Sequence, residues 1–194
     1  ILFVAILVPV GQPHDVSLGG LQPGVFDEDQ GVSRSALYAL ERFRGMVGID
    51  ELQQSLRPLA LASDADQRSR LLAMRALAVL RDERAVEALL PALSERSVLG
   101  EAAWRVLRML TAQDFGSDEN RWRAWFQQHG ARSRTEWLID GLDHEDPEIR
   151  AIAIRDLSRI AGQDFGYQAV MPRSDRQAIR ERFRLWWSSA QGSE

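Results

Sequence analysis

The feature that most constrains this chain is a helical segment that occurs several times. Residues 66–82 (DQRSRLLAMRALAVLRD) align with residues 146–162 (DPEIRAIAIRDLSRIAG), a third copy lies around Ala103, and a fainter one lies around Ala36. In each copy the apolar residues recur at the spacing that places them on one face of an α-helix. Internal repetition of this kind predicts a helical repeat protein.

A second helical stretch precedes each clear copy. We predict these helices over residues 50–62, 84–94 and 134–142. Asp146 followed by Pro147 has the pattern of an N-cap with proline at the first helical position. The repeating unit is therefore a helical hairpin. One hairpin cannot bury its apolar face alone, so we expect the hairpins to stack around a shared core.

The repeated segment resembles the second helix of a HEAT repeat. The residues that carry the resemblance are Asp146, Pro147, Ile149, Arg150, Ala153, Ile154, Leu157 and Ile160. A spacing of about 30 residues is closer to the short HEAT-like repeats of bilin-lyase-related bacterial proteins than to the type of about 40–47 residues. The resemblance covers about residues 50–162. It implies an all-α, armadillo-like α-solenoid, and most proteins of this kind are binding scaffolds.

The middle copy departs from the pattern of its neighbours. The first copy has Asp66 and Arg70 at its start, and the third has Asp146 and Arg150. The middle copy has Arg96 and Gly100 at these positions. We therefore do not expect an Asp-to-Arg ladder to run through all the stacked repeats.

The tetrapeptide Gln-Asp-Phe-Gly occurs at residues 113–116 and again at residues 163–166. Aromatic residues follow each copy at helical spacing: Trp122, Trp125 and Phe126, then Phe183, Trp186 and Trp187. The Asp-Phe-Gly motif of protein kinases is excluded, because no glycine-rich loop, lysine or His-Arg-Asp stretch accompanies it. We expect a glycine-broken turn with its Phe tucked inward, and an aromatic helix folded over the end of the core.

The expected fold is an all-α solenoid of HEAT-like hairpins with an aromatic capping helix at the C-terminus. Residues 32–172 hold the repeats and residues 173–194 the capping helix and tail, whose helix we expect to start at Ser174 with Gln177 as its capping-box partner. Residues 11–31, rich in glycine, form a linker or loop.

Residues 1–10 (ILFVAILVPV) form an apolar run that is shorter than the roughly 20 residues of a membrane-spanning helix. The run matches the apolar core of a truncated secretory signal peptide, and a buried edge strand or a helix fragment are the alternatives. We accordingly expect a periplasmic or extracellular protein, with the cytoplasm as the alternative. No membrane span is expected in the mature chain.

Composition excludes several kinds of catalysis. All 24 basic residues counted as Lys+Arg are arginine, and the chain has no cysteine. Phosphate-binding and Schiff-base lysines, thiol nucleophiles, cysteine zinc sites and iron–sulfur clusters are therefore absent. The three histidines are too far apart in the sequence for a ligand pair, and no Gly-x-Ser-x-Gly motif occurs. We expect no catalytic residues, no metal site and no cofactor.

The candidate binding residues are arginines. Three of them occupy the same repeat position, nearly opposite the apolar face: Arg75, Arg105 and Arg155. Arg108 and Arg159 are expected beside them on the exposed side. Stacking would align these guanidinium groups into a basic stripe on a concave surface, and arginine binds carboxylates bidentately. The alternative is a solvated face with local ion pairs, because Arg105 has Glu101 at helical spacing.

The leading hypothesis is a non-catalytic scaffold that binds a protein partner through an acidic peptide or surface. The net charge of −4 and the lack of lysine argue against nucleic acid. One alternative is a HEAT-like enzyme or enzyme subunit, similar to bilin lyases or DNA glycosylases. Another is a structural spacer of a larger exported protein. We expect the six tryptophans to pack in the core or cap rather than to form a binding surface.

Overall fold

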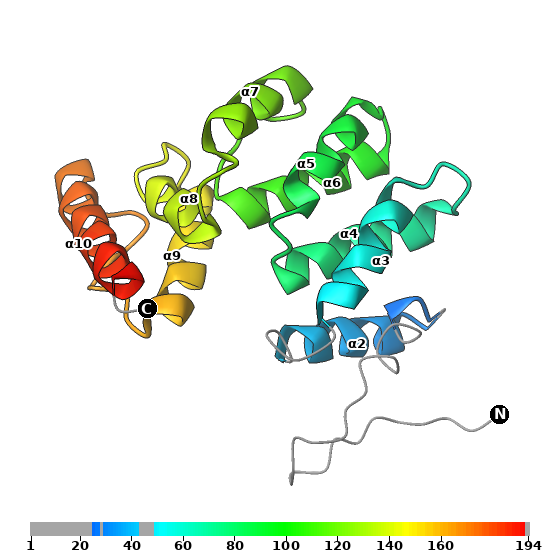
Figure 1. Cartoon of the computed structure of the whole chain (residues 1–194), viewed down its shortest axis with the longest axis horizontal. Coiled ribbons are helices and arrows are strands. Elements are labelled where there is room, and N and C mark those ends of the chain that lie inside the picture. The colour runs from blue at the N-terminus through cyan, green and yellow to red at the C-terminus, as the bar shows by residue number, and fades with distance from the viewer. Residues whose placement is uncertain (1–24, 28, 43–48, 193–194) are drawn as a thin grey trace, which may run out of the picture.

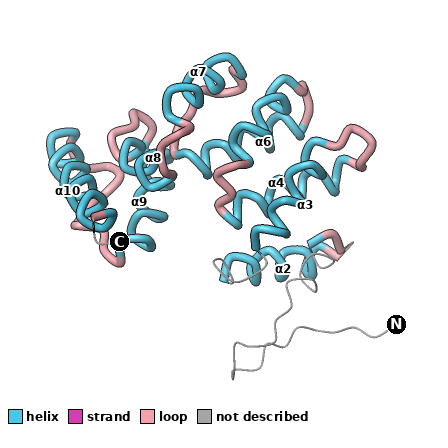
Figure 2. The backbone as a smooth tube through the Cα atoms, in the orientation of Figure 1, coloured by secondary structure: helices cyan, strands magenta, loops and turns pink. Residues whose placement is uncertain are grey.

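The computed structural model describes residues 25–27, 29–42 and 49–192. The apolar segment 1–10 and most of the expected linker lie outside these residues. The described residues form nine α-helices and one 3-10 helix and contain no strand, which confirms the all-α prediction (Figures 1 and 2).

The helices follow the repeat pattern closely. In chain order they are α2 (Gln30–Arg42), α3 (Ile49–Leu61), α4 (Gln67–Leu80), α5 (Ala85–Leu89), the 3-10 helix η2 (Leu90–Ser94), α6 (Val98–Thr111), α7 (Glu119–His129), α8 (Arg134–Gly141), α9 (Pro147–Ala161) and α10 (Arg173–Gln191). The helices predicted before each repeat copy are confirmed as α3, α5 with η2, and α8. The α5 segment changes to 3-10 geometry at Leu90, and the next residue, Pro91, has no N–H to donate to the preceding turn.

The helices pack as consecutive hairpins. Helix α3 packs against α4, α5 and η2 pack against α6, and α8 packs against α9. Helix α4 lies between α2 and α6, whereas the third hairpin meets α6 mainly through α8. Helix α7 is inserted between the second and third hairpins, and Figure 1 shows α2 and α10 on opposite sides of the molecule.

Side-chain caps explain where most of the helices begin. Asp66 accepts a hydrogen bond from the amide of Ser69 at the start of α4, and Asp146 accepts one from Glu148 at the start of α9. Helix α10 differs, because it begins at Arg173 after the extended Pro172 and has no side-chain cap. The capping box expected at Ser174 is therefore wrong.

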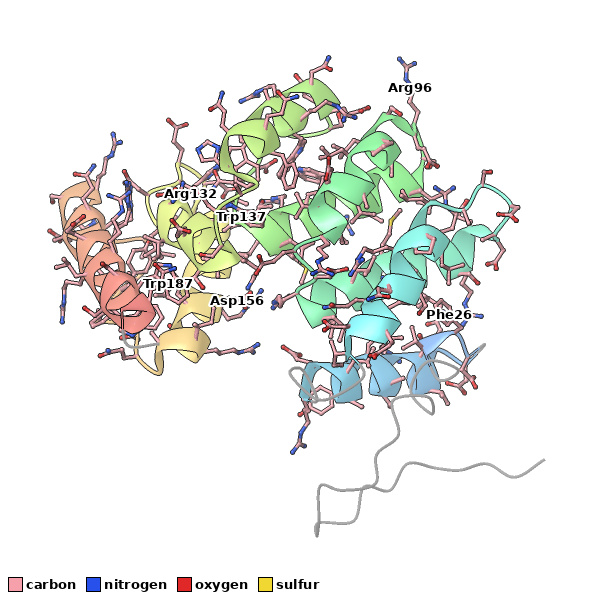
Figure 3. All side chains as sticks on the ribbon, viewed as in Figure 1. Phe26, Arg96, Arg132, Trp137, Asp156 and Trp187 are labelled. Atoms are coloured by element: carbon pink, nitrogen blue, oxygen red, sulfur yellow. The ribbon has the colours of Figure 1, made fainter. Side chains whose placement is uncertain are left out.

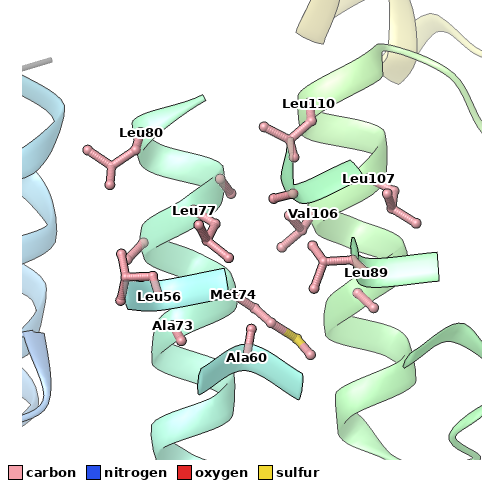
Figure 4. Packing of buried hydrophobic residues seen from close by; sticks show 14 of the residues in the cluster. Leu56, Ala60, Ala73, Met74, Leu77, Leu80, Leu89, Val106, Leu107 and Leu110 are labelled. Carbon is pink, nitrogen blue, oxygen red and sulfur yellow. The ribbon is translucent and has the colours of Figure 1, made fainter. Parts of the chain in front are cut away.

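The core is built from the apolar faces of the repeated helices. Ala73, Met74 and Leu77 of α4 are fully buried, and they lie opposite the apolar side chains of α6 in Figure 4. One buried cluster extends from α2 through α6 and includes Trp122 of α7 and Trp137 of α8, and a second contains residues of α8, α9 and α10. Each fully buried leucine contributes roughly 2 kcal/mol to stability. Since these side chains are buried where helices of neighbouring hairpins meet, the hairpins stabilise one another.

The two Gln-Asp-Phe-Gly segments both turn at their glycine, although Phe165, unlike Phe115, also has a positive φ angle, of 53°. Gly116 and Gly166 have positive φ angles of 60° and 77°. In each turn the glycine amide donates a 2.8 Å hydrogen bond to the preceding carboxylate, from Asp114 or Asp164. Both copies thus confirm the predicted glycine-broken turn.

An aromatic pair follows each turn. Phe115 meets Trp122 edge-on, with ring centroids 4.9 Å apart, and Phe165 meets Phe183 in the same way at 4.8 Å. Trp122 and Phe183 are both fully buried. An arginine also lies over the phenylalanine ring in each copy: Arg121 and Arg182. The predicted inward packing of the two phenylalanines is confirmed.

Gly100 fills the repeat position at which the other clear copies have arginine. A Cβ atom added to it would lie 2.1 Å from the backbone oxygen of Glu95. We expect Gly100→Ala to lower the free energy of unfolding by about 1–3 kcal/mol, despite the higher helix propensity of alanine, because backbone must move to relieve the contact. Urea denaturation followed by tryptophan fluorescence measures the change.

Gly31→Ala is the matched control for this substitution. Its added Cβ would meet a movable side-chain oxygen of Asp29 instead of backbone. We expect this variant to stay within about 0.5 kcal/mol of the native protein. Equal stability of the two variants would contradict the close approach at Gly100.

Candidate functional site

Three exposed arginines occupy equivalent positions on the second helices of the hairpins. We call them the arginine row: Arg75 on α4, Arg105 on α6 and Arg155 on α9. Arg105 forms a 2.5 Å ion pair with Glu101, and both side chains are more than half exposed. The predicted local pair is therefore present. Such solvated pairs are weak and exchangeable, so the row remains accessible to other anions.

Arg108 does not share this exposure, contrary to the prediction. Its side chain is 14% exposed, and its guanidinium lies 3.0 Å from Asp114 and 3.0 Å from Asp146. It also lies over the half-buried Trp104, whose indole N–H donates to Asp114. Arg108 thus connects the end of α6 to the N-cap of α9. Its physical role in the structure is to join these two segments.

Arg159 lies on the same face of α9 as Arg155, one helical turn later. Its Nη1 atom is 2.8 Å from Oε1 of Glu41 at the end of α2. Arg155 lies beside Asp156, with 3.7 Å between Nε and Oδ1. The side chain of Arg159 therefore reaches α2, although the two helices are far apart in the sequence.

An open pocket of about 560 Å³ lies between these elements. We call it the inner groove, and its lining residues are Glu41, Leu80, Arg81, Arg134, Asp156, Arg159 and Ile160. They come from α2, the end of α4, the start of α8 and the last half of α9. Figure 3 shows Asp156 extending from α9 toward the middle of the molecule.

Asp156 is the centre of a buried ion cluster. The Nε atom of Arg81 lies 2.8 Å from Oδ2 of Asp156, its Nη2 atom donates a 3.0 Å hydrogen bond to Oδ1, and Arg134 donates a short hydrogen bond to Oδ2. The side chains of Asp156, Arg134 and Arg81 are only 3%, 7% and 11% exposed. Burial alone would raise the pKa of Asp156, but Arg134 and Arg81 outweigh it and hold the pKa below its ordinary value.

Local backbone structure positions the two arginines. Arg81 caps the end of α4 in the left-handed conformation, with a φ of 57°. Arg134 is the first residue of α8 and donates hydrogen bonds to Leu110 and Met109 in the last turn of α6. These bonds supply partners for carbonyl groups that the end of a helix leaves unpaired. The cluster thereby joins α4, α6, α8 and α9.

This cluster was not predicted from the sequence. One signal was nonetheless present, because Asp156 occupies the repeat position of Ala76 and Val106. Both of these apolar residues are buried. A carboxylate at a buried apolar position requires a charged partner, and that partner had to be sought outside the repeated helix.

The tryptophans pack mainly in the interior. Trp122 and Trp137 are 0% and 2% exposed, and Trp125 lies between them. Trp186 and Trp187 are partly buried against the cluster of α8, α9 and α10. This arrangement agrees with the expected packing role, and it leaves the arginines as the candidate binding groups.

Two further properties concern the described residues only. No group of three or more His, Asp or Glu side chains among them could hold a metal ion. Within residues 25–27, 29–42 and 49–192, no helix combines the length and the hydropathy that a membrane span requires.

Comparison with known proteins identifies a repeat within the chain. Residues 69–95, which cover most of α4 and all of α5 and η2, match the family described as PBS lyase HEAT-like repeat. The predicted resemblance to short HEAT-like repeats is therefore confirmed, and such repeats typically mediate protein interactions. No curated protein and no solved structure shows significant similarity to the chain.

Proposed function

We propose that this HEAT-like repeat protein is a non-catalytic module that binds an acidic segment of a partner protein on the arginine row. The observation that supports the proposal is the equivalent, exposed placement of Arg75, Arg105 and Arg155 on three second helices. The proposal also places the protein in the periplasm or outside the cell, on the basis of the apolar residues 1–10.

Other arginines of the same helices have internal roles, and this contrast favours binding by the row. Arg70 is buried, donates to the carbonyl of Ala60 and pairs with Glu95 at 2.5 Å. Arg150 is also buried and donates to the carbonyl of Ala169 at 2.6 Å. The row arginines point into solvent instead, where a guanidinium can form two parallel hydrogen bonds to a carboxylate.

A fluorescein-labelled octaglutamate peptide provides the test. The row variant carries Arg75→Gln, Arg105→Gln and Arg155→Gln, and we expect it to bind the peptide about tenfold more weakly, equivalent to roughly 1.4 kcal/mol. Fluorescence anisotropy at moderate salt measures the affinity. Exposed substitutions of this kind leave stability within about 0.5 kcal/mol of the native value.

A control variant removes three other exposed arginines and the same amount of charge: Arg84→Gln, Arg96→Gln and Arg123→Gln. We expect it to bind octaglutamate within about twofold of the native protein. Equal loss in both variants would show general charge attraction and contradict the proposal. Tighter, steeply salt-dependent binding of a labelled DNA duplex would favour a nucleic-acid partner instead.

A further inference from the structure

We propose that the inner groove is a binding site for a carboxylate next to an aliphatic residue in the partner segment, and that Glu41 occupies this site in the unbound protein. The inference rests on the proposed function, because it assigns a specific anchoring contact to the same acidic partner. It concerns different side chains, however, and is tested by different variants.

The charges that line the groove are unequal. Three of its lining residues are arginines and two are carboxylates. Asp156 is buried and already binds Arg81 and Arg134. Glu41 is therefore the lining carboxylate that remains for Arg159. When Glu41 moves away, the rim of the groove presents a guanidinium with no opposing lining carboxylate.

The contact between Glu41 and Arg159 is well suited to displacement. The two side chains meet at 2.8 Å, and they are 36% and 51% exposed. Ion pairs with this exposure contribute only about 0–1 kcal/mol. A carboxylate of the partner can take the place of the Glu41 carboxylate at small cost, because it forms the same kind of contact with Arg159.

The apolar part of the lining indicates what accompanies the carboxylate. Ile160 is 46% exposed, and Leu80, the other apolar lining residue, is buried. An aliphatic side chain adjacent to the acidic residue would cover Ile160 and remove apolar surface from water. The volume of about 560 Å³ suits a short segment of a partner chain.

The probe is a fluorescein-labelled Leu-Glu-Leu-Glu peptide, with Leu-Gln-Leu-Gln as its neutral counterpart. We expect Glu41→Gln to bind the acidic peptide about three- to fivefold more tightly than the native protein, because the internal carboxylate no longer competes. Arg159→Gln is expected to bind it about tenfold more weakly. The neutral peptide should bind all of these proteins weakly.

The double variant Glu41→Gln/Arg159→Gln decides whether Glu41 acts through Arg159. We expect it to bind as weakly as Arg159→Gln alone, since the two effects are coupled. A gain that persists in the double variant, or a Glu41→Gln protein that binds no better than the native one, overturns the proposal. Thermal unfolding of each variant checks that the fold is retained.

Failure of this inference is distinguishable from failure of the proposed function. The variant Arg75→Gln/Arg105→Gln leaves all groove residues in place and is expected to keep its affinity for Leu-Glu-Leu-Glu within about twofold. If octaglutamate depends on the row while the groove variants have no effect, the inner-groove proposal is wrong and the proposed function remains. The reverse result keeps the groove and rejects the row.

Discussion

Asp156→Asn is expected to lower the free energy of unfolding by about 3–5 kcal/mol. The substitution keeps the shape of the side chain but removes the charge that Arg81 and Arg134 share in the buried cluster. Removing one partner of a buried ion pair leaves the other charge desolvated and uncompensated, which accounts for the size of the effect. Urea denaturation with circular dichroism and tryptophan fluorescence measures the loss.

Asp64→Asn is the matched control, because Asp64 is exposed in the turn before α4. We expect it to change stability by less than about 0.5 kcal/mol. An Asp156→Asn protein as stable as this control would contradict the buried cluster.

The same cluster predicts a dependence of stability on pH. The pKa of Asp156 lies below its unfolded value of about 3.9, so its contribution to stability is complete above that pH and is lost as the pH falls through the folded pKa. The native protein is therefore expected to lose stability on acidification. Asp156→Asn should show a smaller loss over the same range, because this ionisable group is absent.

The helices could be predicted from the sequence because local signals mark them. Apolar residues such as Leu77 and Leu157 recur at the helical period, and residues such as Asp66 and Asp146 are good N-caps. These signals act within one helix or one turn. The glycine turns of the Gln-Asp-Phe-Gly segments are local in the same sense, and they were predicted for the same reason.

The groove could not be predicted because its residues meet only after the hairpins have packed. Arg81 and Arg134 lie at helix ends, and Glu41 comes from α2, so no spacing in the sequence relates them to Asp156 and Arg159. Packing also explains the misplaced residue in the expected stripe. Arg108 is at an outward position of α6, but the inserted turn brings Asp114 to it.

A second large loss of stability is expected when Trp122, which packs against the first Gln-Asp-Phe-Gly turn, is replaced by alanine. This side chain is fully buried, meets the rings of Phe115 and Trp125, and donates a 2.8 Å hydrogen bond to the carbonyl of Gly116. Trp122→Ala removes the ring and leaves a cavity between α7 and the rest of the core. We expect a loss of about 3–5 kcal/mol in the free energy of unfolding, measured by urea denaturation with circular dichroism.

The chain itself supplies the matched substitution. Phe183 of α10 makes the equivalent ring contact with the second turn, because it meets Phe165 at almost the same distance and angle as Trp122 meets Phe115. Trp122→Phe therefore places at the first turn the kind of ring that packs against Phe165 at the second turn, while it removes the hydrogen bond from the indole N–H to the carbonyl of Gly116. We expect it to cost about 1–2 kcal/mol, well below the alanine variant. If both variants lose the same stability, the two turns are not equivalent in packing, and the hydrogen bond rather than the ring determines the position of α7.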